Sequence, residues 1–89
     1  MLELDYTTQF KRDIKLSRKR GRDTSKLDKI VELLLKETPL PERHKDHLLS
    51  GNYKDHRECH IEPDWLLIYL KQETTLVLVS MGSHSDLFT

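Results

Sequence analysis

Two long apolar segments near the end of the chain constrain its fold most. Residues 65–71 and 74–81 are apolar at nearly every position, and the polar stretch Lys71-Gln72-Glu73 connects them. Such segments are typical of strands that are central in a sheet or covered on both faces. A further predicted strand, 57–62, precedes them and is joined to the first by the turn Glu62-Pro63-Asp64. The sequence therefore predicts a three-stranded antiparallel meander.

Helical spacing dominates the first half of the chain. Phe10, Ile14 and Ser17 fall on one stripe between residues 8 and 20, and Gly21 is a natural end for this predicted helix. A second helix follows capping residues at 23–25 and ends at the proline-containing segment 38–41. Its apolar residues recur at helical spacing and are Leu27, Ile30, Val31, Leu34 and Leu35.

The remaining segments complete the predicted fold. Leu2, Leu4 and Tyr6 alternate with polar residues, which predicts a short, half-buried N-terminal strand. Residues 42–54 are predicted to form an irregular polar loop with a turn at 50–52, and a short helix is expected to begin near residue 83 or 85. We predict an α+β fold, in which an N-terminal strand, two helices and the antiparallel meander form a small sheet with the helices on one face.

Length and composition exclude several classes of protein. The 89 residues predict a single domain spanning 1–89. The longest apolar run, 65–70, is far shorter than the roughly 20 residues that cross a bilayer. The acidic start of the chain is unlike a signal peptide, and the lone Cys59 excludes an internal disulfide. We therefore expect a cytoplasmic protein without a membrane partner.

Positive charge is concentrated in the first half of the chain. Residues 11–22 hold seven basic residues and one acidic residue. A block of this kind can contact phosphates, and it can equally be a solvated helix face or a surface for an acidic protein. The predicted RNA contacts in this block are Lys11, Lys15, Arg18, Lys19 and Arg22.

Two histidine-containing segments carry the candidate chemistry. The first, 57–65, contains His60 and Asp64, and the second, 82–88, contains His84 and Phe88. RNA cleavage through the 2′-hydroxyl requires a base for that proton and an acid for the departing 5′-oxygen, and histidine suits both roles near neutral pH. A terminal aromatic side chain can stack on a base. Together these residues predict metal-independent cleavage of RNA.

Less specific interpretations compete at each position. His60 can be a structural residue on its strand, and Asp64 can be a turn residue. Trp65 fits the core better than a ligand-binding role, although we include it among the predicted RNA contacts. His56 and His60 have the spacing of zinc ligands on a helix, but on a strand they would lie about 13 Å apart. We therefore predict no metal and no cofactor. Cys59 is expected in the core.

The chain resembles the RelE superfamily of bacterial toxin–antitoxin toxins, in particular its YafQ-type branch. The resemblance covers nearly the whole length. Besides the N-terminal strand and helices, it rests on Lys45-Asp46-His47-Leu48-Leu49-Ser50-Gly51, on the segment 53–65 and on Gly82-Ser83-His84-Ser85-Asp86-Leu87-Phe88. It implies a RelE-like fold and a toxin that is a ribosome-dependent endoribonuclease, an mRNA interferase.

The resemblance also implies partners and residue roles. The expected partners are a cognate antitoxin, the ribosome and mRNA, with operator DNA bound only through the antitoxin complex. The positions that match functional residues of the family are His47, His60, Asp64, His84 and Phe88. We expect His84 to be the acid, His60 with Asp64 to act on the base side, His47 to hold the phosphate and Phe88 to stack on a base.

One position departs from the family pattern. The family usually has an arginine two residues before the glycine of the Gly-Ser-His segment, and this chain has Ser80. Loss of an arginine contact to the phosphate weakens transition-state stabilisation. Lys54 or Arg57 is a candidate to compensate, and both are included among the predicted RNA contacts. The alternative is a weakened toxin homologue that acts mainly by binding an antitoxin.

Overall fold

The molecule is built on a five-stranded sheet that carries two helices on one face. It was analysed as a computed structural model that describes residues 1–88. Strand β1 (Glu3–Tyr6) leads into helix α1 (Thr8–Lys19) and helix α2 (Thr24–Leu35). The 3₁₀ turn η1 (Glu42–His44), strand β2 (His47–Leu48) and the 3₁₀ turn η2 (Gly51–Tyr53) follow. Strands β3 (Arg57–Glu62), β4 (Trp65–Lys71) and β5 (Thr75–Gly82) precede the short helix α3 (His84–Phe88).

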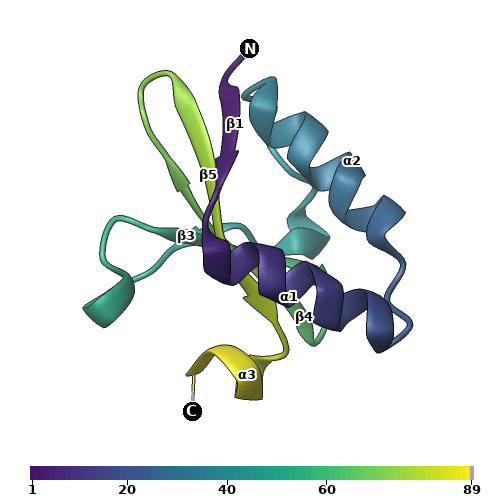
Figure 1. Ribbon diagram of the computed structural model, residues 1–89. Coiled ribbons are helices and arrows are strands. Elements are labelled where there is room, and N and C mark those ends of the chain that lie inside the picture. Colours follow the sequence, from purple (N-terminus) through teal and green to yellow (C-terminus); the bar gives the residue numbers. More distant parts are fainter. Residues whose placement is uncertain (89) are drawn as a thin grey trace.

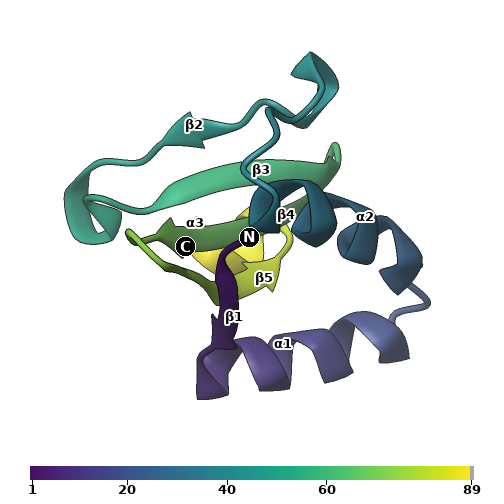
Figure 2. The ribbon, with the colours of Figure 1, turned by 90° about the horizontal axis from the view of Figure 1, so that it is seen from above.

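The predicted α+β class and the antiparallel meander are confirmed. The strand order is β1-β5-β4-β3-β2, and β3, β4 and β5 pair in antiparallel fashion (Figures 1 and 2). One feature of the sheet differs from the prediction, because the segment expected to be a loop contains β2, which pairs with β3. The sequence did not predict the partner of β1, which pairs with β5 in parallel.

Both long helices begin at side-chain caps. The Thr7 hydroxyl accepts a hydrogen bond from the backbone N–H of Phe10, and the Asp23 carboxylate accepts from that of Ser25. Such contacts satisfy N–H groups that have no partner within the helix. Gly21, with φ +78°, ends the first helix as predicted, because glycine adopts the left-handed region without strain.

The hydrophobic core lies between the two helices and one face of the sheet. α1 contacts β5 and α2 contacts β3, and the buried residues of both helices join one cluster with Trp65, Leu67 and Tyr69 of β4. Leu2, the residue just before β1, is buried, whereas the residues of β1 itself are exposed. Leu4 and Tyr6 are each 46% exposed, because β1 is an edge strand. The expectation of a half-buried N-terminal strand is therefore met only in part. No helix within residues 1–88 is long and apolar enough to cross a membrane.

Candidate active site

The first histidine cluster forms where β2 meets β3. His47 lies opposite Glu58 in the β2–β3 register, and His60 lies two residues further along β3, on the same face. The Nε2 atoms of His47 and His60 lie 3.7 and 3.4 Å from Glu58 Oε1. The Glu58 side chain is only 6% exposed, whereas those of His47 and His60 are 50% and 21% exposed. A buried carboxylate thus lies between two accessible imidazoles.

Backbone carbonyls orient both rings of this cluster. His47 Nδ1 is 2.7 Å from the carbonyl oxygen of Lys45, and His60 Nδ1 is 3.2 Å from that of Pro63. Because a carbonyl oxygen only accepts, Nδ1 of each ring carries a proton in these contacts. The Nε2 atom of each ring is then left to exchange a proton, and the Glu58 carboxylate is within hydrogen-bond distance of His60 Nε2 and within ion-pair distance of His47 Nε2.

The second cluster surrounds helix α3. The backbone N–H of His84 donates to Asp64 Oδ1 at 2.9 Å, which joins the β3–β4 turn to the start of the helix. The His84 and Phe88 rings are 5.0 Å apart between centroids, and Phe88 makes an edge contact with Tyr53 at 6.0 Å. Phe88 is 39% exposed. A hollow of about 290 Å³ beside this aromatic pair is lined by Leu49, Ser50, Asn52, Tyr53, Leu87 and Phe88.

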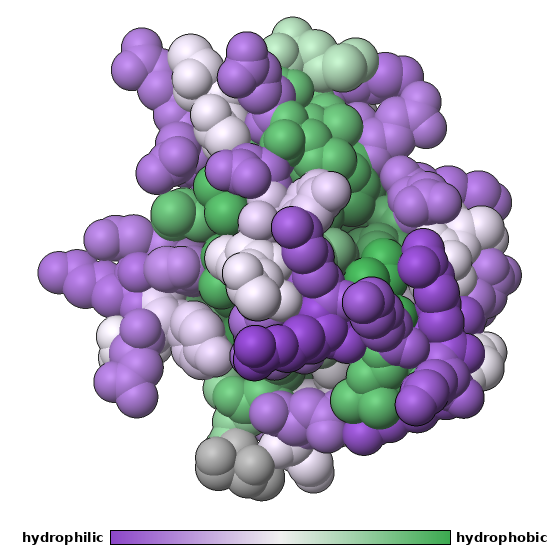
Figure 3. Space-filling view, viewed as in Figure 1, coloured by the Kyte–Doolittle hydropathy of each residue, from purple (hydrophilic) through white to green (hydrophobic). Residues whose placement is uncertain are grey.

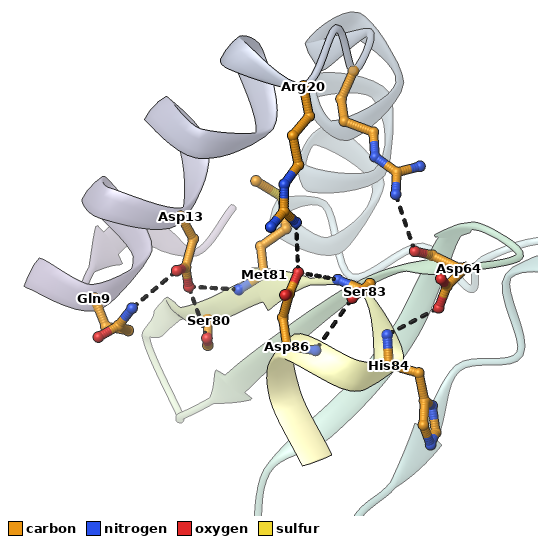
Figure 4. A network of polar contacts seen from close by, with 10 residues as sticks. Gln9, Asp13, Arg20, Asp64, Ser80, Met81, Ser83, His84 and Asp86 are labelled. Atoms are coloured by element: carbon orange, nitrogen blue, oxygen red, sulfur yellow. Dashed lines mark hydrogen bonds and ion pairs between the residues drawn. The ribbon is translucent and has the colours of Figure 1, made fainter. Parts of the chain in front are cut away.

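A capping box and an ion pair hold α3 in place (Figure 4). The Ser83 hydroxyl accepts from the N–H of Asp86 at 3.1 Å, and the Asp86 carboxylate accepts from the N–H of Ser83 at 2.9 Å. Arg20 of α1 donates to the same carboxylate oxygen at 2.7 Å. The Arg20 guanidinium and the Ser83 N–H lower the pKa of Asp86 to about 2. Asp64, Asp86 and Arg20 therefore position the helix that carries His84.

Strand register places the two clusters on one face of the sheet. His60 pairs with Leu66 of β4, and Leu66 pairs with Gly82 of β5, two residues before His84. Because neighbouring strands are about 4.8 Å apart, the backbones at His60 and Gly82 are separated by about 10 Å. Leu66 and Ile68 are fully buried but do not belong to the helix-side core, so they form the apolar floor between the clusters.

Two of the predicted RNA contacts, Trp65 and Arg22, make contacts within the fold. Trp65 is fully buried in the helix-side core, where a nucleotide cannot reach it. The Arg22 guanidinium lies 5.5 Å from the centre of the Trp65 ring, and it donates a hydrogen bond to the carbonyl oxygen of Asp64 at 3.2 Å. Arg22 also lies 3.6 Å from Glu62. Arg22 thus braces the turn that carries Asp64.

Three further predictions are placed differently from what we expected. Arg57 alternates with Glu58, points to the helix side and pairs with Asp46 at 3.2 Å, so it does not join the histidines. Asp64 contacts the backbone of His84, whereas we expected it beside His60. Ser80 lies opposite Ile68 in the β4–β5 register, and its hydroxyl donates to Asp13 at 2.7 Å.

The other predicted RNA contacts are exposed cations. Lys11, Lys15, Arg18 and Lys19 lie on α1, where hydrophilic side chains cover most of the visible face (Figure 3). Lys11 also lies 5.4 Å from the centre of the Tyr6 ring. Lys54 follows η2 and is exposed. Their contact with RNA remains a prediction.

The sequence interpretation missed Glu58. A signal was present, because Glu58 and His60 alternate on one face of a predicted strand and therefore had to be neighbours. Tyr53, which packs against Phe88, gave no comparable signal, because a contact between residues so distant in sequence has no local pattern. Among residues 1–88 no group of three or more histidine, cysteine or acidic side chains is arranged to hold a metal ion.

Comparisons with known proteins identify the family of this chain. Residues 2–89 match the model of the family described as "Bacterial toxin of type II toxin-antitoxin system, YafQ". The mRNA interferase toxin YafQ of Escherichia coli strain K12 is 41% identical over 87 residues, which cover 97% of this chain and 95% of that protein.

Solved structures of the same kind superpose closely. YafQ in the E. coli DinJ–YafQ complex has a TM-score of 0.93 and 39% identity, with all of both chains covered. A metal-bound toxin from Helicobacter pylori has a TM-score of 0.93 and 47% identity, and the match covers 99% of this chain and all of that one. The chain therefore belongs to the YafQ family of bacterial toxins of type II toxin–antitoxin systems.

Proposed function

We propose that the protein is an mRNA interferase that cleaves mRNA on the ribosome by metal-independent acid–base catalysis. The observation that carries this proposal is the buried Glu58 carboxylate between His47 and His60, on the same face of the sheet as His84. The E. coli relative is named as an mRNA interferase. Ribosomes and mRNA would be met in the cytoplasm.

The geometry suits cleavage through the 2′-hydroxyl of the substrate. His60 Nε2 accepts the 2′-hydroxyl proton, and the 2′-oxygen attacks the phosphorus. Glu58, 3.4 Å away, stabilises the imidazolium that forms. His84 donates a proton to the departing 5′-oxygen, so the products are a 2′,3′-cyclic phosphate and a 5′-hydroxyl. Each proton transfer contributes roughly 10²–10⁴ in rate.

The other groups hold the substrate. Protonated His47, on the opposite side of Glu58, supplies positive charge for the phosphorane. Phe88 is exposed enough to stack on a base, and Tyr53 supports its ring from the edge. The hollow beside them gives the base space.

Cleavage assays on ribosomes test this proposal. Purified protein freed of antitoxin is expected to cut bound mRNA in the presence of EDTA and to leave 2′,3′-cyclic phosphate ends. His84→Gln and His60→Gln should each lower the rate by about 10²–10⁴. His56→Gln is the matched control, because the His56 ring reaches the second cluster only through an edge contact with Tyr53, 5.9 Å between ring centroids, and it should cleave at nearly the wild-type rate. Equal rates for wild type and His84→Gln would refute the assignment.

Ser80 supports a second candidate function. It lies beside an irregularity in the β4–β5 register, and its neutral hydroxyl donates to Asp13 of α1, so it supplies no positive charge to the substrate. The chain would then be a weakened homologue that mainly binds its antitoxin, as E. coli YafQ binds DinJ, and joins it on operator DNA. Ser80→Arg should raise cleavage sharply in that case and only modestly for an active nuclease. Growth arrest by the unmodified chain without a partner would exclude the second function.

A further inference from the structure

The outer edge of β3 is only partly covered by its neighbouring strand. β2 pairs with β3 at Arg57 and Glu58 alone, so within residues 1–88 no strand covers the edge from Cys59 to Glu62. The turn η1 lies against this edge instead. His44, only 9% exposed, has its Nδ1 atom 2.7 Å from the carbonyl oxygen of His60, which is the contact a strand would otherwise have made. His44 thereby fixes η1 next to a residue of the candidate active site.

Two hollows flank η1 along this edge, and we call them together the β3-edge groove. The hollow on the α2 side measures about 390 Å³ and includes Lys26, Lys29 and Arg43 in its lining. The hollow on the other side measures about 270 Å³ and includes Arg43, Lys45 and His60. Both share Arg43, so the groove extends from α2 to the imidazole of His60.

The groove is positively charged. Its lining includes four lysine and arginine residues, and Glu62 is its one carboxylate. Glu62 is already paired, 3.2 Å from Lys26 and 3.6 Å from Arg22. Lys29, Arg43 and Lys45 are exposed and keep their charge for a ligand. This charge calls for an anionic ligand, and the position of His60 in the lining favours the RNA strand that is being cut over an acidic peptide.

We propose that the β3-edge groove binds the phosphates of the substrate RNA strand next to the scissile bond. Arg43 and Lys45 contact the phosphate nearest His60, and Lys29 contacts one further along the strand. This inference rests on the proposed function, because it takes His60 as the point where the strand is cut. It places the bound RNA strand along η1 and α2.

Binding of a short oligoribonucleotide tests the groove without cleavage. A fluorescently labelled strand of about ten nucleotides is titrated with His84→Gln protein, and anisotropy is measured over a series of salt concentrations. The test variant adds Lys29→Gln and Arg43→Gln. The control adds Arg12→Gln and Lys71→Gln, which removes the same charge from two exposed positions that are not among the predicted RNA contacts. Thermal melts confirm that all variants fold.

The salt dependence gives the expected magnitude. Each phosphate contact to a single strand contributes about 0.7 to the slope of log affinity against log salt. The groove variant should therefore bind several-fold more weakly with a slope about 1.4 smaller in magnitude, and the control should match its parent. Equal losses in both variants, or a larger loss in the control, would overturn the proposal.

Further measurements separate other ligands and the failure of the parent hypothesis. On ribosomes the groove variant with His84 restored should raise KM and leave kcat nearly unchanged. In another outcome, the groove variant binds vacant ribosomes more weakly than its parent but binds the oligonucleotide equally well. That result would assign the groove to ribosomal RNA and overturn the proposal. Loss of affinity only for an acidic partner protein would overturn it as well. If the wild-type protein does not cleave mRNA, the proposed function fails, whereas the anisotropy result still decides whether RNA occupies the groove.

Discussion

Replacement of Asp86 by alanine tests how α3 is held in place. Asp86 accepts hydrogen bonds from the Ser83 N–H and from Arg20. Loss of a capping contact costs about 1 kcal/mol, and loss of an exposed ion pair about 0.5 kcal/mol. We therefore expect Asp86→Ala to lower the free energy of unfolding by about 1.5 kcal/mol, which corresponds to a fall in Tm of about 6–12 °C for a domain of this size.

The depressed pKa of Asp86 sets an independent limit and a pH dependence. A carboxyl whose pKa falls from 3.8 to about 2 stabilises the folded state by at most about 2.4 kcal/mol. Because the side chain is 34% exposed, solvent screening reduces this figure toward the value above. The folded-state pKa is lower than the unfolded one, so the stabilisation is present above pH 4 and is lost as the pH falls from about 4 to 2.

Thermal denaturation followed by circular dichroism measures both effects. The Tm difference between wild type and Asp86→Ala should be full at pH 7 and should shrink steadily below pH 4. Asp28→Ala, which removes an exposed carboxylate from α2, is the control and should shift stability by less than about 0.5 kcal/mol. Cleavage should fall at least about tenfold in Asp86→Ala, because α3 carries His84. A Tm equal to that of wild type at pH 7, or a difference that persists at pH 2, would refute this account of α3.

Substitutions at three further positions test other parts of the structure. Gly82→Ala would place a Cβ atom 2.9 Å from Asp86 Cβ and Oδ2. The substitution should therefore displace the Asp86 carboxylate and lower both Tm and the cleavage rate. An unchanged Tm would contradict this packing. Tyr69→Phe removes the hydroxyl that donates to Asp46 and should cost about 1–2 kcal/mol in urea denaturation. Trp65→Ala should lower the free energy of unfolding by about 3–5 kcal/mol. Trp65→Phe should lower it much less, because the buried indole N–H has no partner among the described residues. Weaker RNA binding by Trp65→Phe at unchanged stability would show that Trp65 is a ligand contact.

Most secondary structure follows from local sequence. Thr7 and Asp23 act as caps, and Gly21 ends a helix, because these effects depend on a few consecutive residues. The apolar segments of β4 and β5 predict strands for the same reason. β2 could not be predicted, since a strand of two residues has no periodicity of its own and forms only because β3 offers an edge.

The candidate site divides in the same way. The sequence by itself determined the candidate residues, because histidines, carboxylates and a terminal aromatic side chain stood out by type and matched a family. Which of them meet was decided by the tertiary structure. Glu58 lies between His47 and His60 because β2 pairs with β3.

Long-range contacts also decided which polar groups serve the scaffold. Asp64 bonds to His84 because a turn and a chain end distant in sequence meet at one end of the sheet. Arg22 and Arg57 have the same formal charge as the lysines of α1, but neighbouring carboxylates pair with them in the fold. Residue type is a local property, whereas pairing depends on strand register and helix packing, so only the folded chain could separate a group available for substrate from one that holds the fold.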